Sequence, residues 1–522
     1  MTGLPALLRI ELRTSWATVL LLPTLISAVL LVVASEIKDL FPTHDDRVAY
    51  AHSVGEFVPS IALNGRGYDL TTPGGIVTEE LGIFTLLALP ALGIHIAIRL
   101  TRAIEDSGRL ELLTAGRVSR SAPTVAGMLL GLTAIAVLYL TFTASLIAID
   151  LPPSGAIRYS AVMAGLTAAH MAVGWLCAQM SRDARTSYSA AVTAALVFYL
   201  ARLVIDVRGW DATWVSPSSW AAEAQPWAES SPLWPFIAYL VMTALGFVAS
   251  WAISARRDLG GGVLAPRPGP ARASASLSGP WGLAWRLVRG GAFGWTAGIG
   301  AMALACGLIA EEMSDLTENN PQLTAALGSG LDALASLILL LVSIVAAAAG
   351  LQSVGTLVGE ETPGRVGLIL AAPIARPRWW IAVTAIAVGQ VLVTTAVGTA
   401  ALAGSMAWAL DDSSWWATCF EAAAALTPAA LVIVMLTLMA GSVTPTARHA
   451  GWVLLTWSFV ATVFADLLDL PRWVAALSPW DWVGRVPVDS PEWWTIALLA
   501  AVALTLALAS TMTFWRRELR AG

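Results

Sequence analysis

Long apolar runs separated by short polar segments make up most of this 522-residue chain. A helix that crosses a bilayer needs about 20 mostly apolar residues, and runs of that length predict about twelve spans in two sets of six. The first set lies at 15–34, 79–98, 124–147, 157–180, 188–205 and 235–254. The second set lies at 291–310, 333–355, 380–410, 418–440, 450–466 and 495–514. We therefore predict an all-α integral membrane protein.

The composition agrees with a chain that faces lipid. Hydrophobic residues make up 57% of the sequence and charged residues only 12%, whereas a soluble domain carries about 25% charged residues. So few charges cannot cover a water-soluble body of this size, and the lipid bilayer is the expected surrounding. The net charge of −5 gives no reason to expect nucleic acid as a partner.

The positions of the arginines predict which side of the membrane each loop occupies. If the N-terminus is cytoplasmic and the spans alternate, most of the 30 basic residues fall in cytoplasmic segments. This distribution follows the positive-inside rule and also places the C-terminus in the cytoplasm. The first apolar run is longer than a signal-peptide core of about 7–15 residues, so it is interpreted as a retained helix.

Residues 260–280 read "GGGVLAPRPGPARASASLSGP". Repeated Gly and Pro break helices, and this composition is typical of a linker. We predict a cytoplasmic linker here, between a first six-helix repeat at residues 1–259 and a second at residues 281–522.

Two polar segments carry the same pattern in the two halves. Residues 105–120 read "EDSGRLELLTAGRVSR" and residues 361–376 read "ETPGRVGLILAAPIAR". Each has Glu, then Gly-Arg three residues later, an apolar stretch and a closing Arg, at a constant offset of 256 positions. Arg185 and Arg448, both between the fourth and fifth spans of their half, keep a similar offset. We infer a tandem duplication, and the even number of spans per half makes the repeats parallel.

Each polar segment is predicted to form a short amphipathic helix at the cytoplasmic face. The pairs Glu105–Arg109 and Glu361–Arg365 stand four residues apart, so each pair is able to bridge on one helix face. An interfacial helix that only anchors its neighbours is the alternative interpretation. That alternative does not explain the shared spacing of Glu, Gly and Arg.

At these residues the sequence resembles ABC-2 type exporter permeases. The fused arrangement of two six-helix halves is similar to permeases of actinobacterial antibiotic exporters of the tetronasin type. The resemblance implies that the polar segments are coupling helices that dock on a cytoplasmic ATPase subunit. The coupling residues it implies are Glu105, Gly108, Arg109, Arg120, Glu361, Gly364, Arg365 and Arg376. The second segment departs from the first at Gly367, which replaces Glu111, and at Pro363 and Pro373.

The sequence also predicts that this chain does not bind ATP itself. A Walker A loop needs a lysine after its glycines, and the one lysine, Lys38, has no glycine near it. ATP and Mg are therefore expected on the partner, two copies of an ABC ATPase, and no cofactor or enzymatic activity on this chain. The scattered cysteines, Cys177, Cys306 and Cys419, show no metal-ligand spacing, so no catalytic or metal site is predicted.

Aromatic residues inside the spans are candidates for a substrate pathway. If the fifth span of each half lines that pathway, as the resemblance implies, Phe198 and Trp457 contact substrate. Phe84 and Phe464 complete the predicted set. The alternative is that all four are packing residues. Tryptophans near the outer ends of the spans fit an aromatic belt at the membrane interface.

These features together predict the permease subunit of an ATP-driven ABC exporter in the bacterial cell membrane. It would move hydrophobic or amphipathic drugs, antibiotics or lipid-like molecules outward by alternating access. An ion-coupled secondary transporter is an alternative that needs buried ionisable residues, for which His95 and His170 are the main mid-span candidates. A membrane enzyme acting on lipid is a further alternative, which needs an acidic or histidine cluster at one membrane face.

Overall fold

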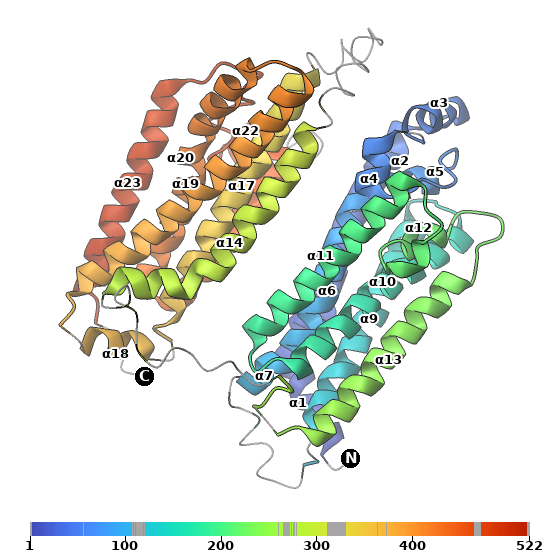
Figure 1. The fold of residues 1–522 in the computed structure, drawn as a ribbon, viewed down its shortest axis with the longest axis horizontal. Coiled ribbons are helices and arrows are strands. Elements are labelled where there is room, and N and C mark those ends of the chain that lie inside the picture. The colour runs from blue at the N-terminus through green and yellow to red at the C-terminus, as the bar shows by residue number, and fades with distance from the viewer. Residues whose placement is uncertain are drawn as a thin grey trace. The chain divides into compact units, whose positions relative to one another are not determined.

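The computed structural model describes the chain from residue 3 to residue 518 with internal gaps. The residues outside the description within that range are 56, 107, 109, 111–117, 120, 259, 265–271, 273, 275–276, 278, 309, 311–329, 363, 372 and 464–470. The chain divides into two compact units, Met1–Gly269 and Pro270–Gly522. Each unit is a bundle of long helices (Figure 1).

Unit 1 holds the first set of helices. In order they are α1 (Leu4–Trp16), η1 (Ala17–Leu21), α2 (Leu22–Leu40), α3 (His44–Val54), α4 (Val58–Asn64), α5 (Pro73–Glu80), α6 (Gly82–Arg99), α7 (Arg102–Asp106), α9 (Ala122–Ala148), α10 (Pro153–Met180), α11 (Ala184–Arg208), η2 (Thr213–Val215), α12 (Trp220–Glu223) and α13 (Trp234–Arg256).

Unit 2 holds the second set. In order they are α14 (Pro280–Gly307), α17 (Gly330–Gly359), α18 (Arg365–Ala371), α19 (Arg376–Ala409), α20 (Ser414–Val443), η4 (Pro445–His449), α21 (Ala450–Val463), α22 (Arg472–Ala475) and α23 (Trp493–Arg516).

Ten of the described helical segments are long and apolar enough to cross a membrane. They are Leu4–Leu40, Gly82–Arg99, Ala122–Ala148, Pro153–Met180, Ala184–Arg208, Trp234–Arg256, Leu331–Gly359, Arg376–Ala409, Ser414–Val443 and Trp493–Arg516. The two other predicted spans overlap α14 and α21. The predicted all-α membrane protein is confirmed. The apolar run at 380–410, too long for a simple span, is one unbroken helix, α19.

The first membrane helix shows how one proline shapes its path. The apolar segment Leu4–Leu40 runs through α1, η1 and α2, and η1 is a π-helical turn. Pro23 has no N–H to donate to the carbonyl of Val19 four residues earlier. A π turn at Ala17–Leu21 accommodates that missing bond, so the helix continues through the proline instead of ending.

Helix α10 lies at the centre of unit 1, packed against α6, α9, α11 and α13. Close approach to α6 depends on glycine, because a Cβ on Gly93 would lie 2.2 Å from the carbonyl oxygen of Thr167. Small residues of this kind let membrane helices pack backbone to backbone. The apolar part of α10 is 72% buried and that of α13 only 17%, so α13 is a peripheral helix held mainly by α10.

Unit 2 has a matching pair, in which α20 packs against the peripheral helix α23. The long helix α19 packs against α14, α17 and α20. Trp380 on α19 stacks on Phe514 of α23 with ring centroids 4.2 Å apart. Only 22% of the apolar part of α23 is buried, so α23 is a peripheral helix like α13. In each unit the last membrane helix therefore packs mainly against the helix of the fourth predicted span.

The polar segments lie at defined ends of the units. In unit 1 the start of α1 and α7 lie at one end, and α3, α5 and α12 lie at the other (Figure 1). In unit 2 α18 lies beside the end of α23, which a contact between Glu361 and Arg517 confirms. The ends that carry α7 and α18 are those that the arginine distribution assigns to the cytoplasm.

Candidate functional site

The first polar segment begins with a buried carboxylate between two arginines. Glu105 lies in the short helix α7 and accepts from Arg102 Nη1 and from Arg257 Nη2, each at 2.5 Å. The exposed fractions of these side chains are 4% for Glu105, 0% for Arg102 and 9% for Arg257. Hydrogen bonds between two charged groups are stronger than those between neutral groups, so the carboxylate is firmly held inside its own unit.

Both arginines also bind the end of α10. Arg102 Nε donates to the carbonyl of Ala178 at 2.7 Å, and Arg257 Nε donates to Gln179 Oε1 at 2.7 Å. Each guanidinium reaches the carbonyl of Gly261 as well. Cations at a helix C-terminus stabilise its unpaired carbonyls and dipole. One small cluster therefore joins α7, the end of α10 and the residues that follow α13.

The second polar segment repeats this arrangement in unit 2. Glu361 Oε2 lies 2.5 Å from Arg517 Nη2, with exposed side-chain fractions of 9% and 17%. Arg517 directly follows α23, as Arg257 directly follows α13. Its Nη1 donates to the carbonyl of Val443, the last residue of α20, at 3.0 Å. In each half an ion pair thus joins the polar segment, the end of the fourth predicted span and the residues that follow the last membrane helix.

The glycine of each segment closes the turn that holds the glutamate. Gly108 and Gly364 have φ values of 72° and 75°, in the left-handed region that favours glycine. Gly108 N donates to the carbonyl of Glu105 at 3.0 Å, and Gly364 N donates to that of Glu361 at 2.9 Å. The repeated Glu-x-x-Gly spacing is therefore the sequence of one backbone turn used twice.

The predicted bridge between each Glu and the Arg four residues later is wrong for the second segment. Glu361 lies in a turn, and Arg365 begins a separate helix, α18, because Gly364 interrupts the helical path. Arg365 pairs instead with Glu360, Nε to Oε2 at 2.6 Å, and its side chain is 60% exposed. Arg376 Nη1 donates to the carbonyl of Arg517 at 3.1 Å. Arg109 and Arg120 lie outside the described residues.

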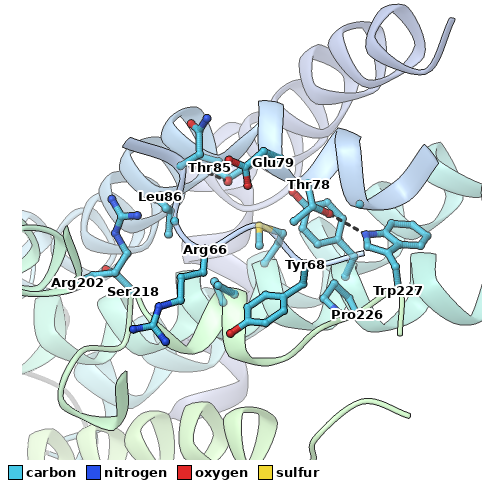
Figure 2. Close-up of a pocket in the computed structure, with 18 residues that line it drawn as sticks. Arg66, Tyr68, Thr78, Glu79, Thr85, Leu86, Arg202, Ser218, Pro226 and Trp227 are labelled. Atoms are coloured by element: carbon cyan, nitrogen blue, oxygen red, sulfur yellow. Dashed lines mark hydrogen bonds between the residues drawn. The ribbon is translucent and has the colours of Figure 1, made fainter. Parts of the chain in front are cut away.

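A second polar cluster lies at the opposite end of unit 1 (Figure 2). Arg202 on α11 has a fully buried side chain that donates to the carbonyls of Ile61, Ala62 and Leu63 at the end of α4. It also pairs with Asp206 one helical turn later, at 3.5 Å. This pair was not predicted from the sequence, although the spacing Arg-x-x-x-Asp in an apolar run is a visible signal for it.

A cavity of about 40 Å³ lies beside this cluster, lined by residues of α5, α6, α10 and α11 and of the segments around them (Figure 2). The hydroxyls of Tyr159 and Ser218 and Nε of Arg202 make no hydrogen bond within the described part of the chain. Glu79 lies on the wall and accepts from the Ser60 hydroxyl at 2.7 Å. Burial raises the pKa of Glu79 to about 7. The cavity suits a few water molecules and is far smaller than a drug pocket of about 300–1,000 Å³.

The aromatic residues predicted along a substrate pathway are found in different settings. Phe84 on α6 is 56% exposed, so it lies on the surface of unit 1 and not in its interior. Phe198 on α11 packs edge-on against His170 of α10, with centroids 6.0 Å apart. Trp457 is a half-buried residue of α21. Phe464 lies outside the described residues.

The two mid-span histidines are also engaged by their neighbours. His95 Nδ1 lies 3.1 Å from the hydroxyl of Tyr188, and His170 Nδ1 lies 2.9 Å from the carbonyl of Leu166 in its own helix. Within the described ranges, no three His, Cys, Asp or Glu side chains are grouped closely enough to hold a metal ion.

The amino-acid sequence of this helical membrane protein is similar to that of known efflux permeases. Residues 277–515 match the family model described as the multidrug efflux system permease Rv1217c, C-terminal domain. The chain is also 28% identical to the multidrug efflux system permease protein Rv1217c of Mycobacterium tuberculosis, across 99% of this chain and 96% of the relative. The predicted class, an exporter permease that crosses the bacterial cell membrane many times, is confirmed by these similarities and by the helices.

Proposed function

We propose that this chain is the transmembrane subunit of an ABC exporter, driven by two copies of a separate cytoplasmic ATPase. The substrates are hydrophobic or amphipathic drugs, antibiotics or lipid-like molecules, moved outward by alternating access. The similarity to a multidrug efflux system permease supports this substrate class. The chain itself neither hydrolyses ATP nor carries a cofactor, since ATP and Mg belong to the partner.

The environment of Lys38, the one lysine in the sequence, supports the proposal that another subunit supplies the energy for transport. Lys38 Nζ donates to the carbonyl of Ile149, just beyond the end of α9, at 2.6 Å. This lysine therefore stabilises a helix end. A P-loop needs a lysine on the β- and γ-phosphates, and the sequence has no second one.

The observation that carries the proposal is the duplicated turn with its buried ion pair. Each half fixes a Glu-x-x-Gly turn against its own membrane helices, and in unit 2 the turn leads directly into α18. The guanidinium of Arg365 at the start of α18 is exposed. Two turns of the same geometry provide two docking segments, one for each ATPase subunit.

Transport into inside-out membrane vesicles tests this function. Vesicles that hold this chain and its ATPase should take up a hydrophobic fluorescent dye on addition of ATP. Vanadate should abolish the uptake and a protonophore should leave it unchanged. Uptake that continues in vanadate and stops with the protonophore would contradict the proposal.

The buried carboxyl of Glu79 favours an ion-coupled secondary transporter as the second candidate. Glu79 lies on α5, before the described membrane helix Gly82–Arg99 begins, although the sequence had predicted a span from residue 79. A pKa of about 7 lets it exchange a proton near neutral pH. This candidate requires that Glu79→Gln abolish transport at every pH. If Glu79 has only a structural role in the polar cluster, the Glu79→Gln variant keeps ATP-driven uptake of the dye. The same vesicle measurement therefore distinguishes the secondary transporter from the ABC exporter.

A further inference from the structure

In each half, the residue that directly follows the last membrane helix is an arginine that pairs with the glutamate of the polar segment, and no sequence pattern had marked it. The arginines are Arg257 and Arg517, the second members of the Arg-Arg pairs at the ends of α13 and α23. Their neighbours Arg256 and Arg516 are exposed, whereas Arg257 and Arg517 turn inward onto Glu105 and Glu361.

Each of these two arginines binds more than one element of its unit at once. Arg257 contacts the glutamate of the polar segment, the side chain of Gln179 on α10 and the carbonyl of Gly261 after α13. Arg517 contacts Glu361 and the carbonyl of Val443 at the end of α20. A guanidinium is planar and donates along fixed directions, so it holds these groups in one geometry.

The helices on which the arginines act form a two-helix unit in each half. Helix α13 packs mainly on α10, and α23 packs mainly on α20. Both last helices are peripheral, so few other contacts restrain them. The ion pair therefore connects the polar segment to the α10–α13 pair in unit 1 and to the α20–α23 pair in unit 2.

We infer that Arg257 and Arg517 are positioning residues that transmit the movement of the two docking segments to these helix pairs. The inference rests on the proposed function, since it assumes that an ATPase moves the segments. It differs from docking: the arginines and the glutamates they hold face the chain's own helices, so their loss should uncouple transport without releasing the ATPase.

The test compares two double variants of the chain. The first combines Arg257→Gln with Arg517→Gln, and the matched control combines Arg256→Gln with Arg516→Gln. Three quantities are measured for each: permease in the membrane, ATPase copurified with it, and dye transported per ATP hydrolysed. The inward pair should keep the bound ATPase and lose at least tenfold in dye transported per ATP. The control should match the parent chain in all three.

An unchanged transport ratio in the inward pair would overturn the inference. If no ATPase copurifies with the parent chain, the proposed function fails instead, so the two failures are distinguishable.

A charge swap distinguishes a loss of transmission from a loss of folding. Unit 2 is the better place for this swap, because there Glu361 is paired with the guanidinium of Arg517. Glu361→Arg with Arg517→Glu should recover at least half of the ratio that Arg517→Glu alone loses. A swap as inactive as the single change, at equal membrane level, would also overturn the inference.

Discussion

The two polar segments share one backbone turn but differ in the charges that hold it. In unit 1 Glu105 lies between two arginines whose side chains are almost entirely buried. In unit 2 Glu361 pairs with Arg517, whose side chain is 17% exposed against 9% for Arg257, and with no second arginine among the described residues. Val358 stands 256 positions after Arg102, where a second guanidinium would be. The two segments therefore have the same turn geometry, but the glutamate of the second has fewer and more exposed charges around it. We expect the first segment to be the more rigid.

Glu105→Gln should have the largest effect. It removes the ion-pair partner of two buried guanidinium groups, and breaking a buried ion pair costs about 3–5 kcal/mol. Thermal denaturation of the purified chain should begin at a clearly lower temperature. Glu518→Gln, at an exposed position beside Arg517, is the control and should not shift the transition.

Glu361→Gln should have a smaller effect of the same kind. It strands one guanidinium with partial access to water, for which about 1–3 kcal/mol is the expected cost. The same denaturation measurement ranks the two variants. Equal losses for Glu105→Gln and Glu361→Gln would remove the proposed difference in rigidity between the segments.

Gly108→Ala and Gly364→Ala should have equal effects, because the turn is shared. A left-handed conformation costs an L-residue about 1–2 kcal/mol, and the two φ values are nearly identical. Open space surrounds a Cβ on Gly108, so there the cost is one of conformation and not of collision. Asn at either position should cost less, since Asn visits this region more readily. Unequal alanine variants would show that the two turns differ in solution.

Arg365→Glu should leave stability almost unchanged and lower ATPase binding. In the Arg365–Glu360 pair the arginine is exposed to water, and ion pairs at the surface are worth about 0–1 kcal/mol. A reversed charge at a docking surface repels the partner. We expect copurified ATPase to fall at least tenfold at equal membrane level. Arg378→Glu, an exposed arginine just beyond the segment, is the control. Arg109→Glu in the first segment stays predicted to be the more damaging change.

Much of the membrane architecture could be predicted from the sequence, because span length is set by bilayer thickness and not by tertiary contacts. The span predicted at 157–180 is α10, Pro153–Met180, and the run at 418–440 is α20, Ser414–Val443. The repeated Glu-x-x-Gly was visible for a local reason, since a left-handed turn requires glycine wherever it occurs.

The partners of the charges that recur in the two halves could not be predicted in this way. Arg257 and Arg517 each stand beside another arginine, and which of the two turns inward depends on the phase of α13 and α23 against their neighbours. The Arg202–Asp206 pair has a local signal in its i, i+4 spacing, but the contact of Arg202 with the carbonyls at the end of α4 is tertiary and has no local pattern. Sequence periodicity locates helices, whereas the direction of a single side chain depends on packing.

The stoichiometry of the assembled transporter tests the central claim most directly. Native mass measurement of the complex purified from its own membrane should give one copy of this chain with two copies of an ABC ATPase, because each half supplies one docking segment. A homodimer of this chain, or a chain that copurifies with no ATPase, would contradict the account.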